Sequence, residues 1–199
     1  YCLAGFIFDW TLYVLWTVIP IHAVHLGAQP AKLAALQAVA SVVYVAMCLL
    51  VGRLSDRVSK ATLLRLGCVG MITACLLVGR TGSLTALFLV MPLAGLSGSL
   101  FWPPVQAAIG SESGPGRLER AIGLFNVLWS AGKGLGFLTA GVIHGHLQTR
   151  TTLLVAAGGA AVVLLFYPWR DARGTAEPPP DPVDPAIRAT FLRMAWVAN

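Results

Sequence analysis

Six stretches of the sequence, each about 20 residues long or longer, are almost entirely apolar. They cover residues 3–24, 31–51, 61–79, 83–109, 121–143 and 151–169. A helix needs roughly 20 apolar residues to cross about 30 Å of hydrocarbon. The stretches show no strand alternation, and the backbone of a membrane span must satisfy its own hydrogen bonds. The sequence therefore predicts an all-α, polytopic membrane protein with a bundle of six transmembrane helices.

The composition agrees with a membrane protein and excludes several other classes. With 57% hydrophobic residues and a mean hydropathy of +0.76, the chain is too apolar to hide its surface in one soluble core. The net charge of +6 is split among short clusters between the apolar runs, which argues against a nucleic-acid partner. The four cysteines form no CxxC pair, so we expect neither a disulfide framework nor a metal site, and no cofactor.

Lysine and arginine are distributed unevenly between the two sets of connections. Of the 14 basic residues, ten lie in the connections after the second, fourth and sixth stretches or close to them, three lie in the other set, and Lys133 lies inside a span. An excess of basic residues marks the cytoplasmic side. We therefore expect a cytoplasmic amino terminus in an integral membrane protein, in a bacterial inner (plasma) membrane.

The carboxy-terminal part of the chain differs in composition from the rest. Residues 171–185, DARGTAEPPPDPVDP, contain five prolines and few residues that could pack in a core. We divide the chain into a six-helix bundle (1–169), a cytoplasmic proline-rich linker (170–185) and the start of a seventh transmembrane helix (186–199). Because the chain begins with Tyr1 and stops inside an apolar run, we expect a fragment of a longer protein.

The second and fifth stretches show a weak similarity to each other. At an offset of 89 positions, three residues are identical and one pair is similar: Ser41 with Ser130, Leu49 with Leu138, Gly52 with Gly141, and Gln37 with Asn126. Small and apolar residues also match by chance. Duplication of a three-helix unit and coincidence therefore both remain open, although transporter folds commonly contain such repeats.

The connection between the second and third stretches carries a recognisable motif, GRLSDRVSK, at residues 52–60. With its helix boundary, its sidedness and the later linker, it resembles the loop in the amino-terminal half of major facilitator superfamily transporters. Ser59 replaces the second glycine of that pattern. The matching residues are Gly52, Leu54, Asp56, Arg57 and Lys60.

The resemblance implies 3+3 inverted repeats, a second six-helix half in a missing carboxy-terminal region, and transport of a small organic solute by alternating access. It also implies a possible coupling proton or ion, and a loop that acts as a conformational latch between the halves. The alternative for the loop is a positive-inside anchor without a latch role.

Two ionisable residues, Asp9 and Lys133, lie inside predicted spans, where charges usually face a cavity or a partner. An ion pair between them and two separate, hydrated charges both remain open. Aromatic and amide side chains on the first, fourth and fifth stretches add a candidate solute surface, with an aromatic belt at the membrane interface as the alternative. The substrate cavity candidates are Asp9, Tyr13, Trp16, Trp102, Gln106, Asn126, Trp129 and Lys133.

Other motifs have simpler interpretations. The glycines around Lys133 do not form a phosphate-binding loop, because Val127 occupies the position of the required earlier glycine. Instead, Gly132, Gly136 and Gly141 are typical of helix packing, and they resemble a degenerate form of the family's antiporter motif. The pairs His22/His25 and His144/His146 are expected to be solvated loop residues rather than metal ligands.

The function expected from these features is transmembrane transport, either secondary active or facilitative. The alternatives are a membrane-embedded enzyme and a six-helix membrane subunit of a multi-component complex. An enzyme is disfavoured because the sequence contains no HExxH or GxSxG motif and no predicted facing pair of carboxylates, so no catalytic residue is assigned.

Overall fold

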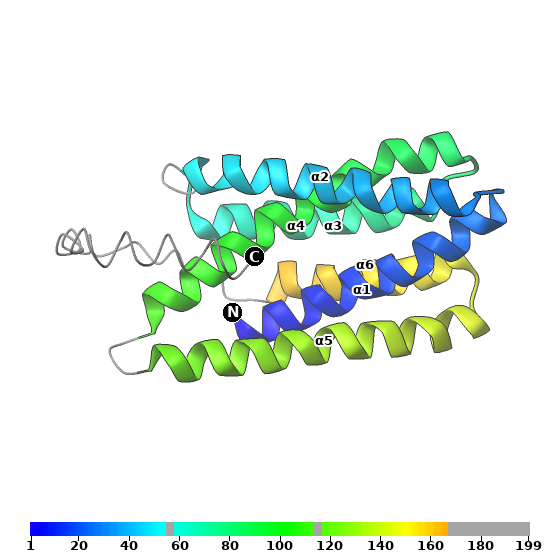
Figure 1. Ribbon diagram of the computed structural model, residues 1–199. Helices are drawn as coiled ribbons and strands as arrows, with labels where there is room; N and C mark the ends of the chain where they lie inside the picture. The colour runs from blue at the N-terminus through cyan, green and yellow to red at the C-terminus, as the bar shows by residue number, and fades with distance from the viewer. Residues whose placement is uncertain (55–57, 114–116, 167–199) are drawn as a thin grey trace.

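The computed structural model describes residues 1–54, 58–113 and 117–166, and this part of the chain is helical throughout apart from short turns (Figure 1). All six predicted spans are present as helices, with ends within a few residues of those expected, and the all-α membrane fold is confirmed. The predicted linker and seventh helix lie outside the described residues. The helices are α1 (Cys2–His25), α2 (Pro30–Leu54), α3 (Lys60–Val78), α4 (Leu84–Glu112), α5 (Leu118–His146) and α6 (Thr149–Phe166).

Local sequence signals set several helix ends. Ser59 caps α3, since its side chain accepts a hydrogen bond from the Thr62 amide at 3.2 Å, and Ser83 caps α4 in the same way. Serine is among the residues best suited to this position. The residue at which the loop motif departs from the family pattern therefore has a structural role of its own. In the turn after α1, Gly27 adopts a φ of 83°, which favours glycine.

Successive helices run in opposite directions, so the turns gather at two ends of the bundle (Figure 1). At one end, Lys60 Nζ donates to Ser111 Oγ at 3.1 Å and connects the start of α3 to the end of α4. At the other end, the His22 ring contacts both the carbonyl and the hydroxyl of Thr81 at 3.0 Å. This alternation is the arrangement that six membrane crossings require.

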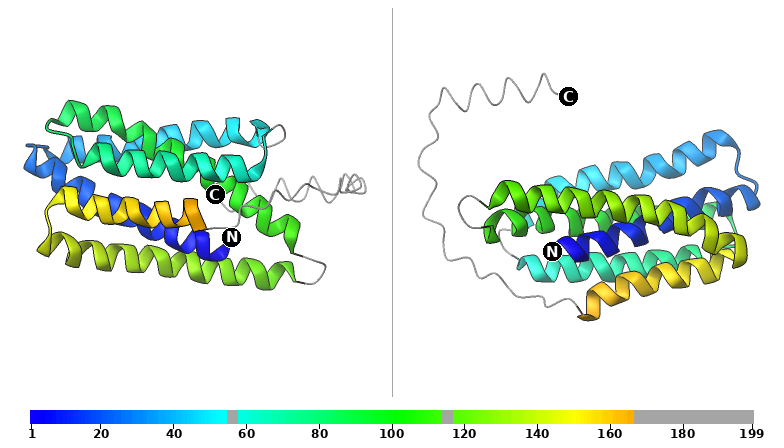
Figure 2. Two further views of the ribbon diagram at one scale, coloured as in Figure 1. Left: turned by 180° about the vertical axis from the view of Figure 1, so that it is seen from behind. Right: turned by 90° about the horizontal axis from the view of Figure 1, so that it is seen from below.

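The six helices pack as two groups of three. Helix α1 lies against α5 and α6, helix α4 lies against α2 and α3, and the groups join mainly where α3 meets α6 (Figures 1 and 2). These close pairings stay the same when α1, α2 and α3 are exchanged with α4, α5 and α6. The packing therefore has the internal symmetry expected of a duplicated three-helix unit.

The two groups also touch at the crossing of α1 and α4. Phe8 and Phe101 stack there with their ring centroids 3.7 Å apart and an interplanar angle of 2°, and both are fully buried. Phe101 follows Phe8 by 93 positions, and at the same offset Gly5 matches Gly98. The first and fourth helices thus carry a correspondence like the one found between the second and fifth.

Glycines allow the closest helix contacts. A Cβ atom at Gly132 would collide with the Phe6 carbonyl of α1, and one at Gly136 would lie 2.8 Å from the Trp10 carbonyl oxygen. Helix packing is therefore observed for these two residues. Gly141 is exposed and has nothing within 4 Å of its Cβ position, so it packs closely against no helix in the described part of the chain.

Candidate functional site

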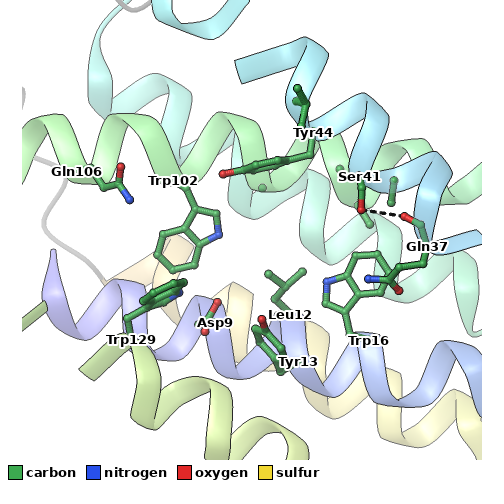
Figure 3. Close-up of a pocket in the computed structure, with 15 residues that line it drawn as sticks. Asp9, Leu12, Tyr13, Trp16, Gln37, Ser41, Tyr44, Trp102, Gln106 and Trp129 are labelled. Carbon is green, nitrogen blue, oxygen red and sulfur yellow. Dashed lines mark hydrogen bonds between the residues drawn. The ribbon is translucent and has the colours of Figure 1, made fainter. Parts of the chain in front are cut away.

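A cavity of about 320 Å³ lies between α1, α2 and α4, with one residue of α5 at its edge (Figure 3). Its size falls in the range of pockets that hold small organic molecules. Six of the eight predicted cavity residues line it. The lining consists of Asp9, Leu12, Tyr13, Trp16, Gln37, Ala40, Ser41, Tyr44, Val45, Ala94, Gly95, Gly98, Trp102, Gln106 and Trp129.

Helix α1 contributes one continuous face to the cavity. Asp9, Tyr13 and Trp16 share this face because residues three, four and seven positions apart lie on one side of a helix. Trp10, three positions before Tyr13, does not line the cavity. Its indole Nε1 instead donates to Thr139 Oγ1 of α5 at 2.8 Å, which holds the ring against the neighbouring helix.

The most unusual group in the cavity wall is the carboxylate of Asp9. The side chain is 1% exposed, and its Oδ2 atom has no hydrogen-bond partner among the described residues. The buried Nε1 atom of Trp129 also has none, and the two side chains lie close together in the wall (Figure 3). Buried polar groups are normally paired, so an unpaired one in a cavity wall points to a binding role.

Lys133 lies beside the cavity rather than in its lining. Its Nζ atom sits 3.9 Å from the centroid of the Trp129 ring and 5.0 Å from that of Tyr13. No ion pair between Asp9 and Lys133 forms in the described part of the chain, because the ammonium is directed to the two rings. Lys133 therefore makes cation–π contacts, and the ion pair that the sequence left open as one of two alternatives is not formed among the described residues.

Asn126 is exposed and does not line the cavity, contrary to the expectation. The reason is the rotation of α5, which turns Gly132 and Gly136 toward α1. Asn126 lies six positions before Gly132, and at 3.6 residues per turn it projects from another side of the helix.

The contribution of α2 to the cavity was not predicted from the sequence. Gln37, Ser41 and Tyr44 line the cavity, and Ser41 Oγ donates to the Gln37 carbonyl oxygen at 3.0 Å (Figure 3). Their spacing of four and three residues was the available signal, since it places polar atoms along one side of an apolar helix. In the sequence, Gln37 and Ser41 stand out only as members of the possible repeat.

Aromatic rings form the end of the cavity near α5. The Trp102 and Trp129 rings meet edge to face, with centroids 6.0 Å apart, and Trp129 stacks on Phe125 at 6.5 Å. Trp102 also contacts Phe8 at the crossing of α1 and α4. This cluster fixes the ring orientations, because each aromatic side chain is held by at least one other.

The remaining predicted sites divide into described and undescribed residues. Gly52 and Leu54 belong to the last turn of α2 and Lys60 begins α3, whereas Asp56 and Arg57 lie outside the described residues. The four cysteines are free. Within the ranges that the structure describes, no group of three or more His, Cys, Asp or Glu residues is placed to hold a metal ion.

Comparisons with known proteins agree with this architecture. The sequence model of the Major Facilitator Superfamily matches residues 1–198. The puromycin resistance protein pur8 of Streptomyces alboniger is 29% identical over 118 residues, which are 59% of this chain and 24% of that protein. Among solved structures, a mutant of the peptide transporter POT in complex with sulfate matches with a TM-score of 0.71 and 18% identity. That match covers 99% of this chain and 43% of the other, so the chain spans less than half the length of either relative.

Proposed function

Since the chain belongs to the major facilitator superfamily, we propose that it forms the amino-terminal half of a transporter that moves a small organic solute by alternating access. The observation that carries this proposal is the cavity between α1, α2 and α4, which combines a buried carboxylate, amides and aromatic rings inside a six-helix membrane bundle. In transporters of this architecture, solute sites lie between two bundles that rock about them.

The second bundle belongs to the proposal as well. Helices α2 and α5 are the least buried of the six, and they expose large apolar side chains such as Leu49 (73%), Val127 (66%) and Leu138 (66%). Such faces suit contact with further helices or with lipid. We propose that residues 170–185 link this bundle to a second one, whose first helix begins at about residue 186.

The solute class is supported by the relatives. One is named for resistance to puromycin and the other for peptide transport, and both names concern organic solutes. We propose a solute of this general kind, moved either down its own gradient or with a coupled proton or ion. Asp9, Tyr13, Trp16, Trp102, Gln106 and Trp129 are the proposed contacts, and Lys133 is a neighbour of that set.

The loop between α2 and α3 is the proposed latch. Gly52, Leu54, Asp56, Arg57 and Lys60 would dock the second bundle when the cavity opens outward, and the bond from Lys60 to Ser111 supports a fixed start of α3. A carboxylate such as that of Asp56 suits the exposed amides at a helix amino terminus. The excess of basic residues supports a cytoplasmic position for this loop and for the amino terminus, in a bacterial inner membrane.

The test uses full-length protein in liposomes. Solute candidates, including puromycin and small peptides, are screened for protein-dependent flux, which the proposal requires for at least one solute. Asp56→Asn is then expected to reduce that flux roughly ten-fold, as loss of a contact of about 1.4 kcal/mol would. Glu119→Gln, which removes one carboxylate at the exposed start of α5, is the control and should leave flux unchanged. Full flux with Asp56→Asn would contradict the latch role, and absence of flux for every solute would contradict transport.

A further inference from the structure

The described lining of the cavity contains a charged side chain of one sign only, which is negative. Asp9 is the only side chain in the described lining that belongs to Asp, Glu, Lys, Arg or His. Its Oδ2 atom is buried and has no hydrogen-bond partner in the described part of the chain. A carboxylate removed from water is stable when a positive group compensates it. The described lining therefore offers one buried negative site, and the nearest positive group, Lys133, lies beside the lining rather than in it.

The rest of the wall also suits a positive group. Five of the 15 lining residues are aromatic, namely Tyr13, Trp16, Tyr44, Trp102 and Trp129. The faces of such rings carry partial negative charge and attract ammonium groups within about 6 Å. The neutral polar side chains Gln37, Ser41 and Gln106 add hydrogen-bonding groups without adding charge.

Lys133 shows that two of these rings accept an ammonium. Its Nζ atom lies over Trp129 and within 5.0 Å of the Tyr13 ring centroid. The same two rings reach the cavity lining, but Lys133 does not. A cation in the cavity would therefore contact rings that already hold an ammonium group. The positive charge of Lys133 would also repel it.

We propose that this cavity selects organic cations, meaning solutes with an ammonium group on an apolar or aromatic body. The ammonium pairs with Asp9, the tryptophan and tyrosine rings surround it, and the body extends along α1 toward Trp16 and Tyr44. The inference rests on the proposed function, because it names the solute class of the same site. It also makes two opposite predictions, since Asp9 favours the cation and Lys133 opposes it.

The experiment measures binding to full-length, detergent-purified protein at neutral pH with three probes of one shape. Saturable binding of radiolabelled 2-phenylethylammonium is recorded, and unlabelled 2-phenylethanol and phenylacetate serve as neutral and anionic competitors. The cation should bind roughly ten-fold more tightly than the alcohol, and the anion should not compete. Asp9→Asn should weaken binding of the cation about ten-fold and change that of the alcohol little.

The lysine supplies the opposite test. Lys133→Met should strengthen binding of the cation several-fold, because it removes a nearby positive charge and frees the Trp129 face. Glu119→Gln and Lys32→Met change the same charges at exposed positions outside the lining and should leave binding unchanged. Circular dichroism and size-exclusion profiles of each variant identify any loss of folding, and Asp9→Glu, which keeps the charge, should retain preference for the cation.

Several outcomes would overturn the proposal. They are the absence of saturable binding of the cation, equal binding of the cation and the alcohol, and competition by phenylacetate that disappears with Lys133→Met. Binding and transport remain separable. Flux of another solute without binding of the cation would refute the inference and leave transport intact, whereas binding without flux of any solute would refute transport alone.

Discussion

At the scale of single residues, the hydrogen bond from Trp10 to Thr139 connects α1 to α5 inside the membrane region. Thr139 Oγ1 accepts from the indole at 2.8 Å and itself donates to the Leu135 carbonyl oxygen at 2.7 Å. Thr139→Val removes the acceptor and leaves the indole N–H unpaired in an apolar groove lined by Phe6, Ile7 and Leu135. We expect a loss of about 1 kcal/mol of unfolding free energy, measured by denaturation in detergent.

Thr73→Val is the matched control for that substitution. Thr73 Oγ1 also donates to the backbone carbonyl oxygen four residues before it, at 2.8 Å, but no side chain among the described residues bonds to it. Its replacement should cost less than that of Thr139. In the Trp10→Phe background the cost of Thr139→Val should shrink, because no indole N–H remains to be left unpaired. Equal losses for the two threonines would contradict the role of the bond.

Single residues also show which parts of the cavity lining can be predicted from a sequence. Asp9 could be predicted because a charge in an apolar run is expensive and needs a reason. Tyr44 was missed because nothing along the chain tells which side of α2 faces α1 and α4 and which side is exposed. Asn126 and Lys133 were placed in the lining for the same reason, since the rotation of α5 follows from its glycines meeting particular carbonyl groups of α1. The fit of these glycines against α1 depends on both helices, so it cannot be predicted from the sequence of α5 alone.

At the scale of elements, the packing of α5 on α1 depends on glycine. Gly132→Ala places a methyl group against the Phe6 carbonyl, which is backbone and cannot rotate away. We expect a loss of roughly 1–3 kcal/mol, as for other overpacked sites. Gly141→Ala adds the same group to the same helix in open space and should not lower stability. Thermal unfolding of the two variants in detergent checks the difference, and an equal decrease would contradict the close approach.

The elements themselves could be predicted well, because each span is a long apolar run and the requirement for internal hydrogen bonds leaves only the helix. Their ends were less certain. In the sequence, Ser59 stands out only as a departure from a family pattern, whereas its bond to the Thr62 amide makes it the cap of α3. The symmetry between helix groups was visible only as scattered identities, since membrane helices preserve small and apolar character more than particular residues. The Phe8–Phe101 stack identifies where the two groups meet.

At the scale of the whole molecule, the two ends of the bundle should differ in their access from outside the cell. Gly82 lies exposed in the turn between α3 and α4, and Arg117 lies exposed at the start of α5, at opposite ends of the bundle. In intact cells, a membrane-impermeant maleimide should label Gly82→Cys and should not label Arg117→Cys. The unmodified chain serves as the blank for its four native cysteines.

Membrane vesicles turned inside out should reverse this labelling pattern. The reason is the basic residues at the Arg117 end, because an excess of lysine and arginine is expected on the cytoplasmic side. Labelling of Arg117→Cys in intact cells, with protection of Gly82→Cys, would contradict the proposed orientation of the amino terminus.

The grouping of α1 with α5 and α6 also has a consequence for the order in which the protein is made. Helix α1 leaves the ribosome before the other five helices, but its main partners follow more than 90 residues later, whereas α2, α3 and α4 emerge consecutively and α4 packs on both of the others. Contacts between residues far apart in sequence form late. During synthesis we therefore expect α1 to lack its main partners until α5 arrives, and we expect the nascent chain to be most exposed to quality control in this interval.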